Sequence, residues 1–406
     1  MKCGLLGRKL GHSYSPQIHS FLGDYSYELF EKEPEEIEDF LKNGDFSGIN
    51  VTVPYKKAVI PYLDELTPTA QKLGAVNTIY RKNGLLIGHN TDLYGFQMML
   101  QETGLSPAGK KCLVLGSGGA SNTVCAVLRD YGADVVTISR SGENNYDNLH
   151  LHKDAAILVN TTPVGMFPEV GKSVLDLAQF PHLDGVLDVI YNPARTRLLL
   201  DGQKLGIVTG NGLRMLVAQA KEAAEYFTDK PISEDQIKRI HHHLKQQMEN
   251  TILIGMPGCG KSTIGKRLAQ ISGKRFVDAD AEIEKFAGKT IPEIFTESGE
   301  AEFRHLETQV LTHLGKQSGL VIATGGGCVT REENYDHLHQ NGTIFWLQRD
   351  LGKLPTDGRP LSQKNKLADM YTIRRPLYEA FADARIDNNG PVDTAVDAIL
   401  AWEETE

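Results

Sequence analysis

Residues 251–263, TILIGMPGCGKST, decide the fold of the C-terminal half of this 406-residue chain. Its strand-like start, TILI, runs into a loop that matches the phosphate-binding pattern G-x-x-x-x-G-K-[ST] without a mismatch. A strand, a glycine-rich loop and a helix in this order predict a P-loop domain, because glycines let backbone amides bend round a phosphate. The residues expected to bind the nucleotide are Gly255, Gly258, Gly260, Lys261, Ser262 and Thr263, with Lys261 at the outer phosphates and Ser262 at magnesium.

Two carboxylates follow this loop at a spacing that would let both side chains take part in a reaction at one strand end. Asp278 and Asp280 lie in a segment expected to be extended, where residues two apart face the same side. One carboxylate would then lie near magnesium and the other at an acceptor hydroxyl. A solvated strand end has the same sequence, so the pair alone leaves both interpretations open.

Arginines and glycines later in this half add two further signals. Arg304, Arg359 and Arg374 carry planar guanidinium groups that suit a carboxylate or a phosphoryl group, although surface salt bridges are their commoner use. Three glycines, residues 325–327, follow the strand-like run 320–322 and allow a ligand to approach the backbone, or a tight turn.

Residues 250–406 resemble shikimate kinase, a small P-loop phosphotransferase with a parallel sheet. The resemblance implies that Asp280 contacts the ring hydroxyls and is the catalytic base, and that Asp278 supports magnesium. It also implies that Arg304 and Arg374 hold the substrate carboxylate together with the backbone amide of Gly326.

The same resemblance implies that Arg359, in the run DGRPL at residues 357–361, is a lid arginine that joins Lys261 in catalysis at the ATP phosphates. One departure concerns the base of the nucleotide. The run KLPT at residues 353–356 stands where the family has an arginine against the adenine.

The N-terminal half has its own strand, turn and helix. The apolar run CLVL at 112–115 leads into GSGGAS at 116–121, and further strand-like runs at 134–138 and 155–159 alternate with helical patterns. This alternation predicts a doubly wound, Rossmann-like dinucleotide-binding domain, although Ser121 replaces the third glycine of the usual fingerprint. The residues expected against the cofactor are Gly116, Gly118, Gly119 and Ala120.

The cofactor is predicted from the end of the second strand of this domain. An NAD enzyme would place an acidic residue there, whereas this chain has Ser139-Arg140-Ser141. An arginine between hydroxyls suits a 2′-phosphate, so NADP is favoured over NAD, with a solvated strand-end arginine as the alternative.

Residues 1–100 contain polar groups suited to binding and proton transfer. In Ser13-Tyr14-Ser15-Pro16, Ser15 is expected to cap a helix that begins at Pro16. Hydroxyls and free amides there suit an anion such as a carboxylate, although plain capping explains them equally well. Lys56, in the run NVTVPYK, and Asp92, in GHNTD, would together handle the proton of an alcohol whose hydride goes to a nicotinamide.

Residues 1–240 resemble shikimate dehydrogenase, including the runs GAVNT at 74–78, NTTPVGM at 160–166, YNP at 191–193 and GLRMLVAQ at 212–219. The resemblance implies that Lys56 and Asp92 are the catalytic pair and that Asn77 and Gln219 bind ring hydroxyls. It implies a carboxylate site of Ser13, Ser15, Thr52 and Tyr191. Asn122 departs from the family, many members of which have a basic residue after the glycine loop, so Arg140 carries more of the 2′-phosphate contact.

We therefore expect an α/β protein with a substrate domain at 1–101 plus a returning helix at 213–240, an NADP domain at 102–212 and a P-loop kinase domain at 250–406. The polar stretch 241–249, which begins with three histidines, is expected to be a linker or a solvated helix end. Consecutive histidines on one helix cannot face a single metal ion.

Composition narrows the class of protein. The formal net charge is −9 and no long basic stretch occurs, which disfavours nucleic acid and anionic membranes as partners. Five scattered cysteines predict reduced thiols, and the absence of a signal peptide or long apolar run predicts a cytoplasmic enzyme acting on small molecules. The sequence does not indicate an oligomeric state.

The function expected is NADPH-dependent reduction of 3-dehydroshikimate to shikimate, followed by ATP- and Mg²⁺-dependent phosphorylation of shikimate at its 3-hydroxyl. The alternative is a quinate/shikimate dehydrogenase that uses NAD, fused to a regulatory module that binds ATP without transfer.

Overall fold

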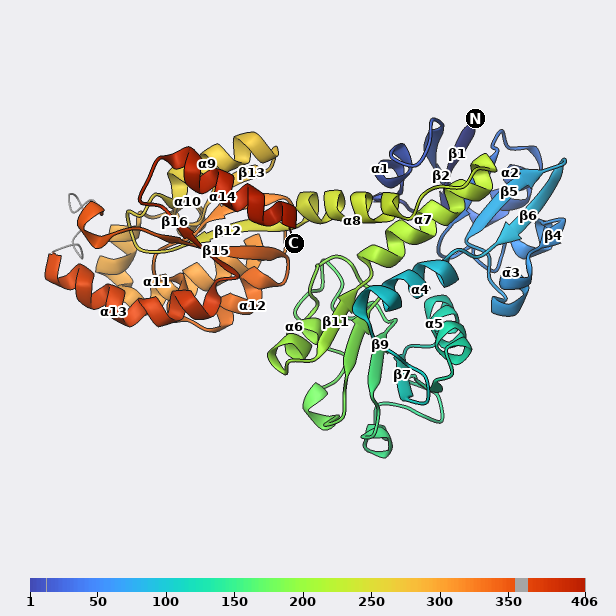
Figure 1. The fold of residues 1–406 in the computed structure, drawn as a ribbon, viewed down its shortest axis with the longest axis horizontal. Coiled ribbons are helices and arrows are strands. Elements are labelled where there is room, and N and C mark those ends of the chain that lie inside the picture. Colours follow the sequence, from blue (N-terminus) through green and yellow to red (C-terminus); the bar gives the residue numbers. More distant parts are fainter. Residues whose placement is uncertain (12, 355–363, 406) are drawn as a thin grey trace. The chain divides into compact units, whose positions relative to one another are not determined.

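A computed structural model describes residues 1–11, 13–354 and 364–405 of the chain (Figure 1). Arg359, the expected lid arginine, lies outside the described residues. The chain divides into two compact units. The first contains Met1–Met166, Gly171–Tyr191 and Leu198–His243, and the second contains Phe167–Val170, Asn192–Arg197 and Leu244–Glu406.

The first unit begins with a mixed sheet of strand order β2-β1-β3-β5-β6-β4. Its strands are β1 (Lys2–Gly7), β2 (Ser26–Glu31), β3 (Gly48–Val51), β4 (Glu65–Leu66), β5 (Thr78–Lys82) and β6 (Leu85–His89). β1 pairs in parallel with β2 and β3, and β5 pairs antiparallel with β3 and β6. The helices of this domain are α1 (Ser15–Ser20), α2 (Ile37–Asn43) and α3 (Pro68–Leu73).

A second, fully parallel sheet follows with the order β11-β10-β9-β7-β8. Its strands are β7 (Lys111–Leu115), β8 (Asp134–Ile138), β9 (Ile157–Asn160), β10 (Gly185–Asp188) and β11 (Val208–Asn211). The helices are α4 (Asp92–Thr103), α5 (Gly119–Asp130), α6 (Arg197–Lys204) and α7 (Leu213–Thr228), and α4 packs alongside α7 (Figure 1). The strand predicted at 134–138 is confirmed, and the one predicted at 155–159 begins two residues later.

The second unit contains a parallel sheet of order β13-β14-β12-β15-β16. Its strands are β12 (Asn250–Ile254), β13 (Arg275–Asp278), β14 (Leu320–Ala323), β15 (Gly342–Gln348) and β16 (Ala384–Asp387). The helices are α9 (Lys261–Ser272), α10 (Ala279–Ala287), α11 (Ile291–Gly315), α12 (Glu333–His339), α13 (Lys364–Phe381) and α14 (Val392–Thr405). β15 is buried at its first six positions and its centre, Ile344–Leu347, is apolar, as expected for a parallel sheet covered by helices on both faces.

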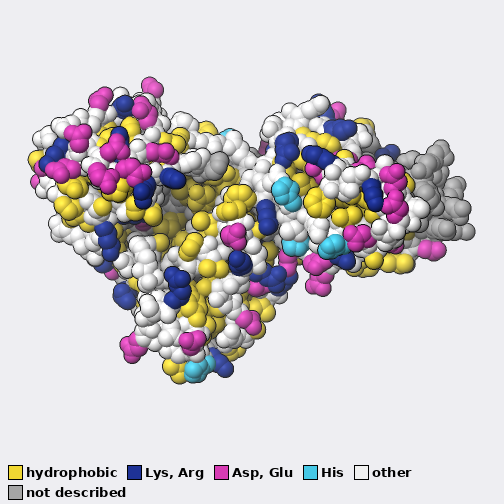
Figure 2. All heavy atoms as spheres, turned by 180° about the vertical axis from the view of Figure 1, so that it is seen from behind, with side chains coloured by type: hydrophobic (Ala, Val, Ile, Leu, Met, Phe, Trp, Pro, Cys, Tyr) yellow, Lys and Arg dark blue, Asp and Glu magenta, His cyan; other side chains and the backbone are white. Residues whose placement is uncertain are grey.

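Short 3₁₀ helices lie at Pro34–Glu36, Ile60–Tyr62, Leu149–His152, Leu177–Gln179, Cys328–Thr330 and Leu351–Lys353. Within the described ranges, no helix is both long and apolar enough to cross a membrane. On the face shown in Figure 2, basic side chains are interspersed with acidic ones.

Helix α8 (Asp235–Met248) contains most of the stretch expected to be a linker. Ile237, Ile240, Leu244 and Met248 are each at most 3% exposed, so one face of this helix is apolar and buried. The stretch is therefore helical and only partly solvated, and the division between the two units falls inside it, at His243 and Leu244. The predicted domain limits themselves stay a prediction.

All five cysteines are free and buried, with exposed fractions of at most 5%. Burial raises the pKa of Cys3 and Cys112 to about 11 and that of Cys328 to about 12. They pack as small apolar side chains, as the scattered spacing predicted.

Candidate active sites

A cavity of about 310 Å³ in the first unit collects the side chains predicted for the dehydrogenase. Those lining it are Ser13, Ser15, Thr52, Lys56, Asn77, Asp92, Tyr191 and Gln219, joined by Ala120 of the cofactor loop. Ser15, Asp92, Ala120 and Gln219 lie in helices α1, α4, α5 and α7, and the other residues lie in the connecting segments. The structure therefore brings together in one cavity groups that are up to 206 positions apart in the sequence.

Lys56 and Asp92 form a tight pair in this cavity. Lys56 Nζ donates to Asp92 Oδ2 at 2.6 Å, and the two side chains are 27% and 13% exposed. Asp92 is the first residue of α4, where a carboxylate interacts favourably with the helix dipole. Asn77 Nδ2 donates to its other oxygen at 2.9 Å, so both carboxylate oxygens are held in place.

Asn77 is the centre of a buried hydrogen-bond network. Its amide also reaches Thr91 Oγ1 at 3.1 Å and Gln219 Oε1 at 3.4 Å, and its carbonyl accepts from the backbone N–H of Thr91 at 2.7 Å. Asn90 Oδ1 accepts from the backbone N–H of Asp92 at 3.0 Å. Thr91 and Asn90 were not predicted as supports of Asp92, although both lie in the run GHNTD at residues 88–92.

The part of the cavity expected to bind an anion, at the start of α1, differs from the prediction. Helix α1 begins at Ser15 itself, and Tyr14 occupies the cap position without a side-chain cap bond. The prediction that Ser15 caps the helix is therefore wrong by one residue, since Ser13 Oγ accepts from the backbone N–H of Ser15 at 3.2 Å and closes a local turn. Tyr14 packs edge to face on Tyr191, with ring centroids 6.1 Å apart, and burial raises the pKa of Tyr191.

Asn50 is a further lining residue to which sequence reasoning gave no role. It is 5% exposed in the apolar strand β3, accepts from Tyr27 OH at 2.8 Å and donates to Thr78 Oγ1 at 3.2 Å. An isolated polar residue inside an apolar strand was the available signal, because buried amides are kept only where partners satisfy them.

The glycine loop between β7 and α5 fits a dinucleotide phosphate. Gly116 has φ +109°, and a methyl group there would lie 2.8 Å from Thr161 Oγ1. Gly118 and Gly119 have open space where a side chain would project, which leaves room for a ligand at the start of α5. Ser121, in place of the third glycine, is 1% exposed. A small buried side chain suffices there for close packing of helix on strand.

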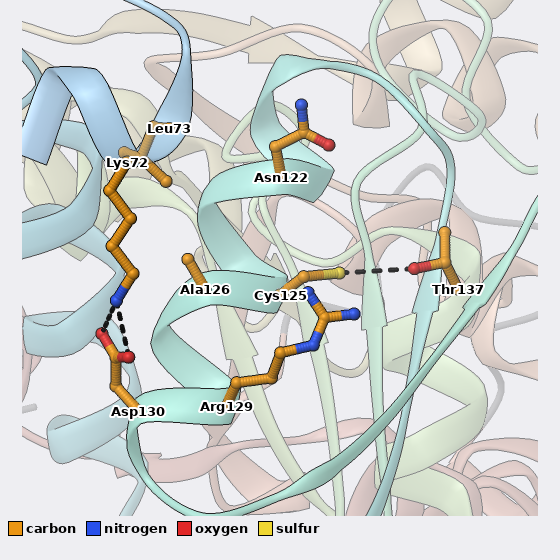
Figure 3. A pocket seen from close by; sticks show the side chains of 8 residues that line it. All are labelled: Lys72, Leu73, Asn122, Cys125, Ala126, Arg129, Asp130 and Thr137. Carbon is orange, nitrogen blue, oxygen red and sulfur yellow. Dashed lines mark hydrogen bonds and ion pairs between the residues drawn. The ribbon is translucent and has the colours of Figure 1, made fainter.

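Ser139 and Arg140 follow β8, as predicted for a 2′-phosphate site, and Arg140 is exposed. A separate pocket of about 500 Å³ is lined by side chains of α3, α5 and β8 (Figure 3). Cys125 Sγ and Thr137 Oγ1 meet at 3.4 Å across it, and Lys72 Nζ donates to both oxygens of Asp130 at 2.6 and 2.7 Å. These contacts tie α5 to β8 and to α3, and none of the predicted cofactor residues lines the pocket.

In the second unit the P-loop is formed as predicted. Gly260 has φ +102°, and α9 begins at the next residue. Lys261 is 8% exposed and its Nζ donates to the carbonyls of Gly255 and Met256 at 2.9 and 3.1 Å. Ser262 Oγ donates to Asp278 Oδ2 at 2.6 Å. A hydroxyl and a carboxylate side by side are oxygen donors of the kind that Mg²⁺ prefers, so the residues fit the metal.

Asp280 is placed by a different geometry from the one expected. The chain turns helical at Ala279, and Asp278 caps α10 by accepting from the backbone N–H of Asp280 at 3.1 Å. The extended spacing predicted for the pair is therefore wrong, yet both carboxylates stay at the same strand end. Burial, and then the charge of Asp278, raise the pKa of Asp280. Its Oδ1 is buried without a hydrogen-bond partner, as expected for an atom that awaits a ligand.

Arg304 reaches the same place from α11. Its guanidinium donates to Glu307 Oε2 at 2.7 Å, and Glu307 is completely buried with a raised pKa caused by burial. A methyl group at Gly325 would lie 2.7 Å from Glu307 Oε1 and 2.8 Å from Asp280 Oδ1, and one at Gly327 would lie 2.3 Å from Arg304 Nη2. The glycines thus let the backbone pass against the charged groups.

Arg374 and Tyr378 of α13 both donate to the carbonyl oxygen of Gly326, the former at 3.1 Å. The structure therefore gathers Asp280, Arg304, Gly326 and Arg374 as predicted. Glu307 and Tyr378 were missed. Their spacing from Arg304 and Arg374, three and four residues along a helix, was the signal that places each pair on one helix face.

Comparison with known proteins identifies both halves. Residues 257–403 match the family model of shikimate kinase, and residues 5–79 match that of the shikimate dehydrogenase substrate binding domain. A shikimate dehydrogenase (NADP(+)) of Syntrophomonas wolfei is 36% identical over 282 residues, covering 61% of this chain and 96% of that protein. One of Caldanaerobacter subterraneus is 37% identical over 262 residues, covering 57% and 93%.

Solved structures of shikimate dehydrogenases are also similar to the N-terminal part of this chain. Shikimate dehydrogenase 1 of Peptoclostridium difficile, 36% identical, covers 60% of this chain and 97% of its own, with a TM-score of 0.55. A chorismate mutase/shikimate 5-dehydrogenase fusion protein of Clostridium acetobutylicum, 35% identical, covers 60% and 97% with a TM-score of 0.58.

The folds and sites define a dinucleotide-dependent oxidoreductase joined to a P-loop phosphotransferase. The chain belongs to the shikimate dehydrogenase family and carries a shikimate kinase domain in its C-terminal part. It is a bifunctional enzyme of the shikimate pathway, dependent on NADP(H) and on ATP with Mg²⁺.

Proposed function

We propose that the first unit reduces 3-dehydroshikimate to shikimate and that the second phosphorylates the 3-hydroxyl of shikimate, so that the product of one site is the substrate of the other. The observation that carries this proposal is the cavity in which Lys56, Asp92, Asn77 and Gln219 meet the start of the cofactor helix at Ala120. The test is a coupled assay from 3-dehydroshikimate, NADPH and ATP to phosphorylated shikimate. Quinate in place of shikimate, and NADH in place of NADPH, test the alternative specificity, and shikimate-dependent ADP release tests the alternative of a silent kinase module.

In the dehydrogenase, bound NADPH supplies the hydride to the ring carbonyl. Lys56 Nζ gives a proton to the oxygen that becomes the hydroxyl, and Asp92 holds the amine in line through the 2.6 Å hydrogen bond. Asn77 and Gln219 hold neighbouring ring hydroxyls, and the hydroxyls of Ser13, Ser15 and Thr52 with Tyr191 take the carboxylate. The reverse reaction returns the proton to Lys56.

In the kinase, Mg²⁺ supplies charge neutralisation on the ATP phosphates when bound, and Ser262 and Asp278 are the residues that would hold it. Asp280 accepts the proton of the attacking hydroxyl. Arg304 and Arg374 hold the carboxylate of the ring, and Lys261 contacts the outer phosphates. Arg359 stays a predicted further contact to the phosphates.

We expect Arg140→Ala to weaken NADP binding by several-fold to about a hundredfold and to leave NAD binding nearly unchanged, because only the 2′-phosphate offers a charge-assisted hydrogen bond to this exposed guanidinium. Calorimetric titration with both cofactors measures the effect. Arg140→Lys keeps the charge and should recover part of the NADP affinity. An equal loss for both cofactors would assign Arg140 a structural role instead.

We also propose that the two activities are separable, with domain limits at 1–101 plus 213–240, 102–212 and 250–406. Supporting this, each unit has its own parallel sheet and its own buried core. A cut after residue 247 leaves Leu244 with the first piece, whereas a cut after His243 leaves it with the second, where its contacts lie. We expect 1–243 to retain dehydrogenase activity and 244–406 to retain kinase activity. Insoluble or inactive pieces at both cuts would show that the units depend on one another. A cytoplasmic location likewise stays a prediction.

A further inference from the structure

Arg349 is a cation beside the P-loop that the reaction described above does not use. It directly follows β15, and its Nε is buried without a hydrogen-bond partner. Its Nη1 lies 3.8 Å from the point where a side chain at Gly260 would begin. The guanidinium therefore lies against the phosphate loop itself, next to the residue that precedes Lys261.

No carboxylate neutralises this charge in the described part of the chain. The acidic neighbours that follow β15 and end β16 are engaged elsewhere: Asp350 lies 3.7 Å from Lys353 Nζ, and Asp387 Oδ1 accepts from the backbone and side chain of Asn389 at 3.1 and 2.7 Å. A guanidinium stays charged at any physiological pH and leaving its donors unpaired costs free energy. A donor held this way next to a phosphate loop indicates an anionic ligand.

The surroundings of Arg349 are held firmly in place. Asn388 is 3% exposed, donates from its side chain to the carbonyl of Cys259 in the P-loop and donates from its backbone N–H to Gln348 O at 2.8 Å. The backbone N–H of Asp350 donates to Asn389 Oδ1 at 2.9 Å. The end of β15, the loop after β16 and the P-loop are thereby tied together, so the backbone that carries Arg349 is held beside the P-loop.

The strand order indicates which part of the nucleotide Arg349 meets. The groups around the acceptor, Asp280 after β13 and Gly325 after β14, lie on one side of the central strand β12. Arg349 follows β15, on the opposite side of β12. The phosphoryl group that is transferred must face the acceptor, so the inner end of the nucleotide extends toward β15 and β16.

We propose that Arg349 binds the α-phosphate of ATP and so supplies a contact to the nucleotide in addition to that of Lys261. This inference rests on the proposed kinase function of the P-loop. It requires no bond to change in the reaction, because Arg349 contacts phosphate oxygens only, through charged hydrogen bonds.

The test compares nucleotide affinities of Arg349→Ala, Arg349→Lys and wild type by calorimetry with ADP, and by inhibition of kinase turnover with AMP and adenosine. We expect Arg349→Ala to weaken ADP and AMP binding about tenfold or more, since a charge-assisted hydrogen bond is lost, with adenosine unaffected and Arg349→Lys intermediate. Arg267→Ala is the matched control, because that arginine is exposed on α9 and pairs with Asp393 at 2.9 Å.

Several outcomes would overturn the proposal. Unchanged ADP affinity would show that Arg349 does not touch the nucleotide, and an equal loss for adenosine would place it against the base rather than a phosphate. A loss confined to ATP would place it at the outer phosphate. As a control for folding, Arg349→Ala should raise the KM for ATP and leave the KM for shikimate unchanged, which excludes general misfolding of the variant. If wild type binds ADP but does not phosphorylate shikimate, the kinase function fails while the ADP affinities still decide the role of Arg349.

Discussion

Replacing Lys56 by alanine is expected to lower dehydrogenase turnover at least about a hundredfold, the lower end of general acid-base contributions. The Lys56 amine lies 2.6 Å from Asp92 Oδ2, and among the described residues no other lysine lines this cavity. Asp92→Asn should lower turnover by a similar factor, because the neutral amide that replaces the carboxylate is no longer an anionic acceptor for the Lys56 amine. The measurement is the rate of NADPH oxidation with 3-dehydroshikimate at saturating concentrations of both.

Two controls test whether the effects of these substitutions are specific. Lys57→Ala removes the adjacent, exposed lysine and should leave turnover unchanged. The kinase activity of each variant reports that the rest of the chain is intact. If Lys56→Ala or Asp92→Asn retains near-normal turnover, the proton passes through another group and the assignment of the pair is wrong.

Asp280→Asn is expected to have the second large effect, a loss of phosphoryl transfer of at least about a hundredfold with ATP binding retained. Asp280 lies with Glu307 and Arg304 against residues 325–327, whereas Lys261 and the loop amides hold the triphosphate. Lys261→Ala should therefore damage nucleotide binding and transfer together, and the two variants separate the roles of acceptor and phosphate groups.

The measurement is shikimate-dependent ADP release, with ATP affinity determined on the same preparations. Glu282→Gln is the matched control on α10, since Glu282 makes only a 3.7 Å pair with Lys285. A normal transfer rate in Asp280→Asn would mean that the hydroxyl proton leaves without this carboxylate.

Local patterns predicted the parallel sheets well. The strands at 134–138 and around 251–254 and the helices after both glycine loops follow from apolar runs that meet glycines, because each such run must be buried and each loop must turn. Motif positions also led to residues that line one cavity in the first unit, whereas the roles of the site residues stay predictions.

What failed depends on tertiary context. Ser15 and Asp280 were each placed on the wrong side of a helix start, because either neighbouring residue satisfied the local pattern and only the packed chain decides between them. Glu307 and Tyr378 each lie on the same helix face as a predicted arginine, but helical spacing shows only which residues are neighbours and not which of them contacts the site. The apolar face of α8 was hidden in a run that is polar on average.

The reactivity of the five buried thiols can report how readily each part of the chain opens. A thiol reacts as its thiolate and only when exposed, so the raised pKa values and near-zero exposures of Cys3, Cys112 and Cys328 make alkylation wait for local opening. One thiol lies in the substrate domain, two in the dinucleotide domain and two in the kinase domain, where Cys259 belongs to the P-loop itself. Mass spectrometry of timed alkylation would therefore report the opening rate of each domain in the intact enzyme. NADP should slow labelling of Cys112 and Cys125, and ADP should slow that of Cys259, without any engineered probe.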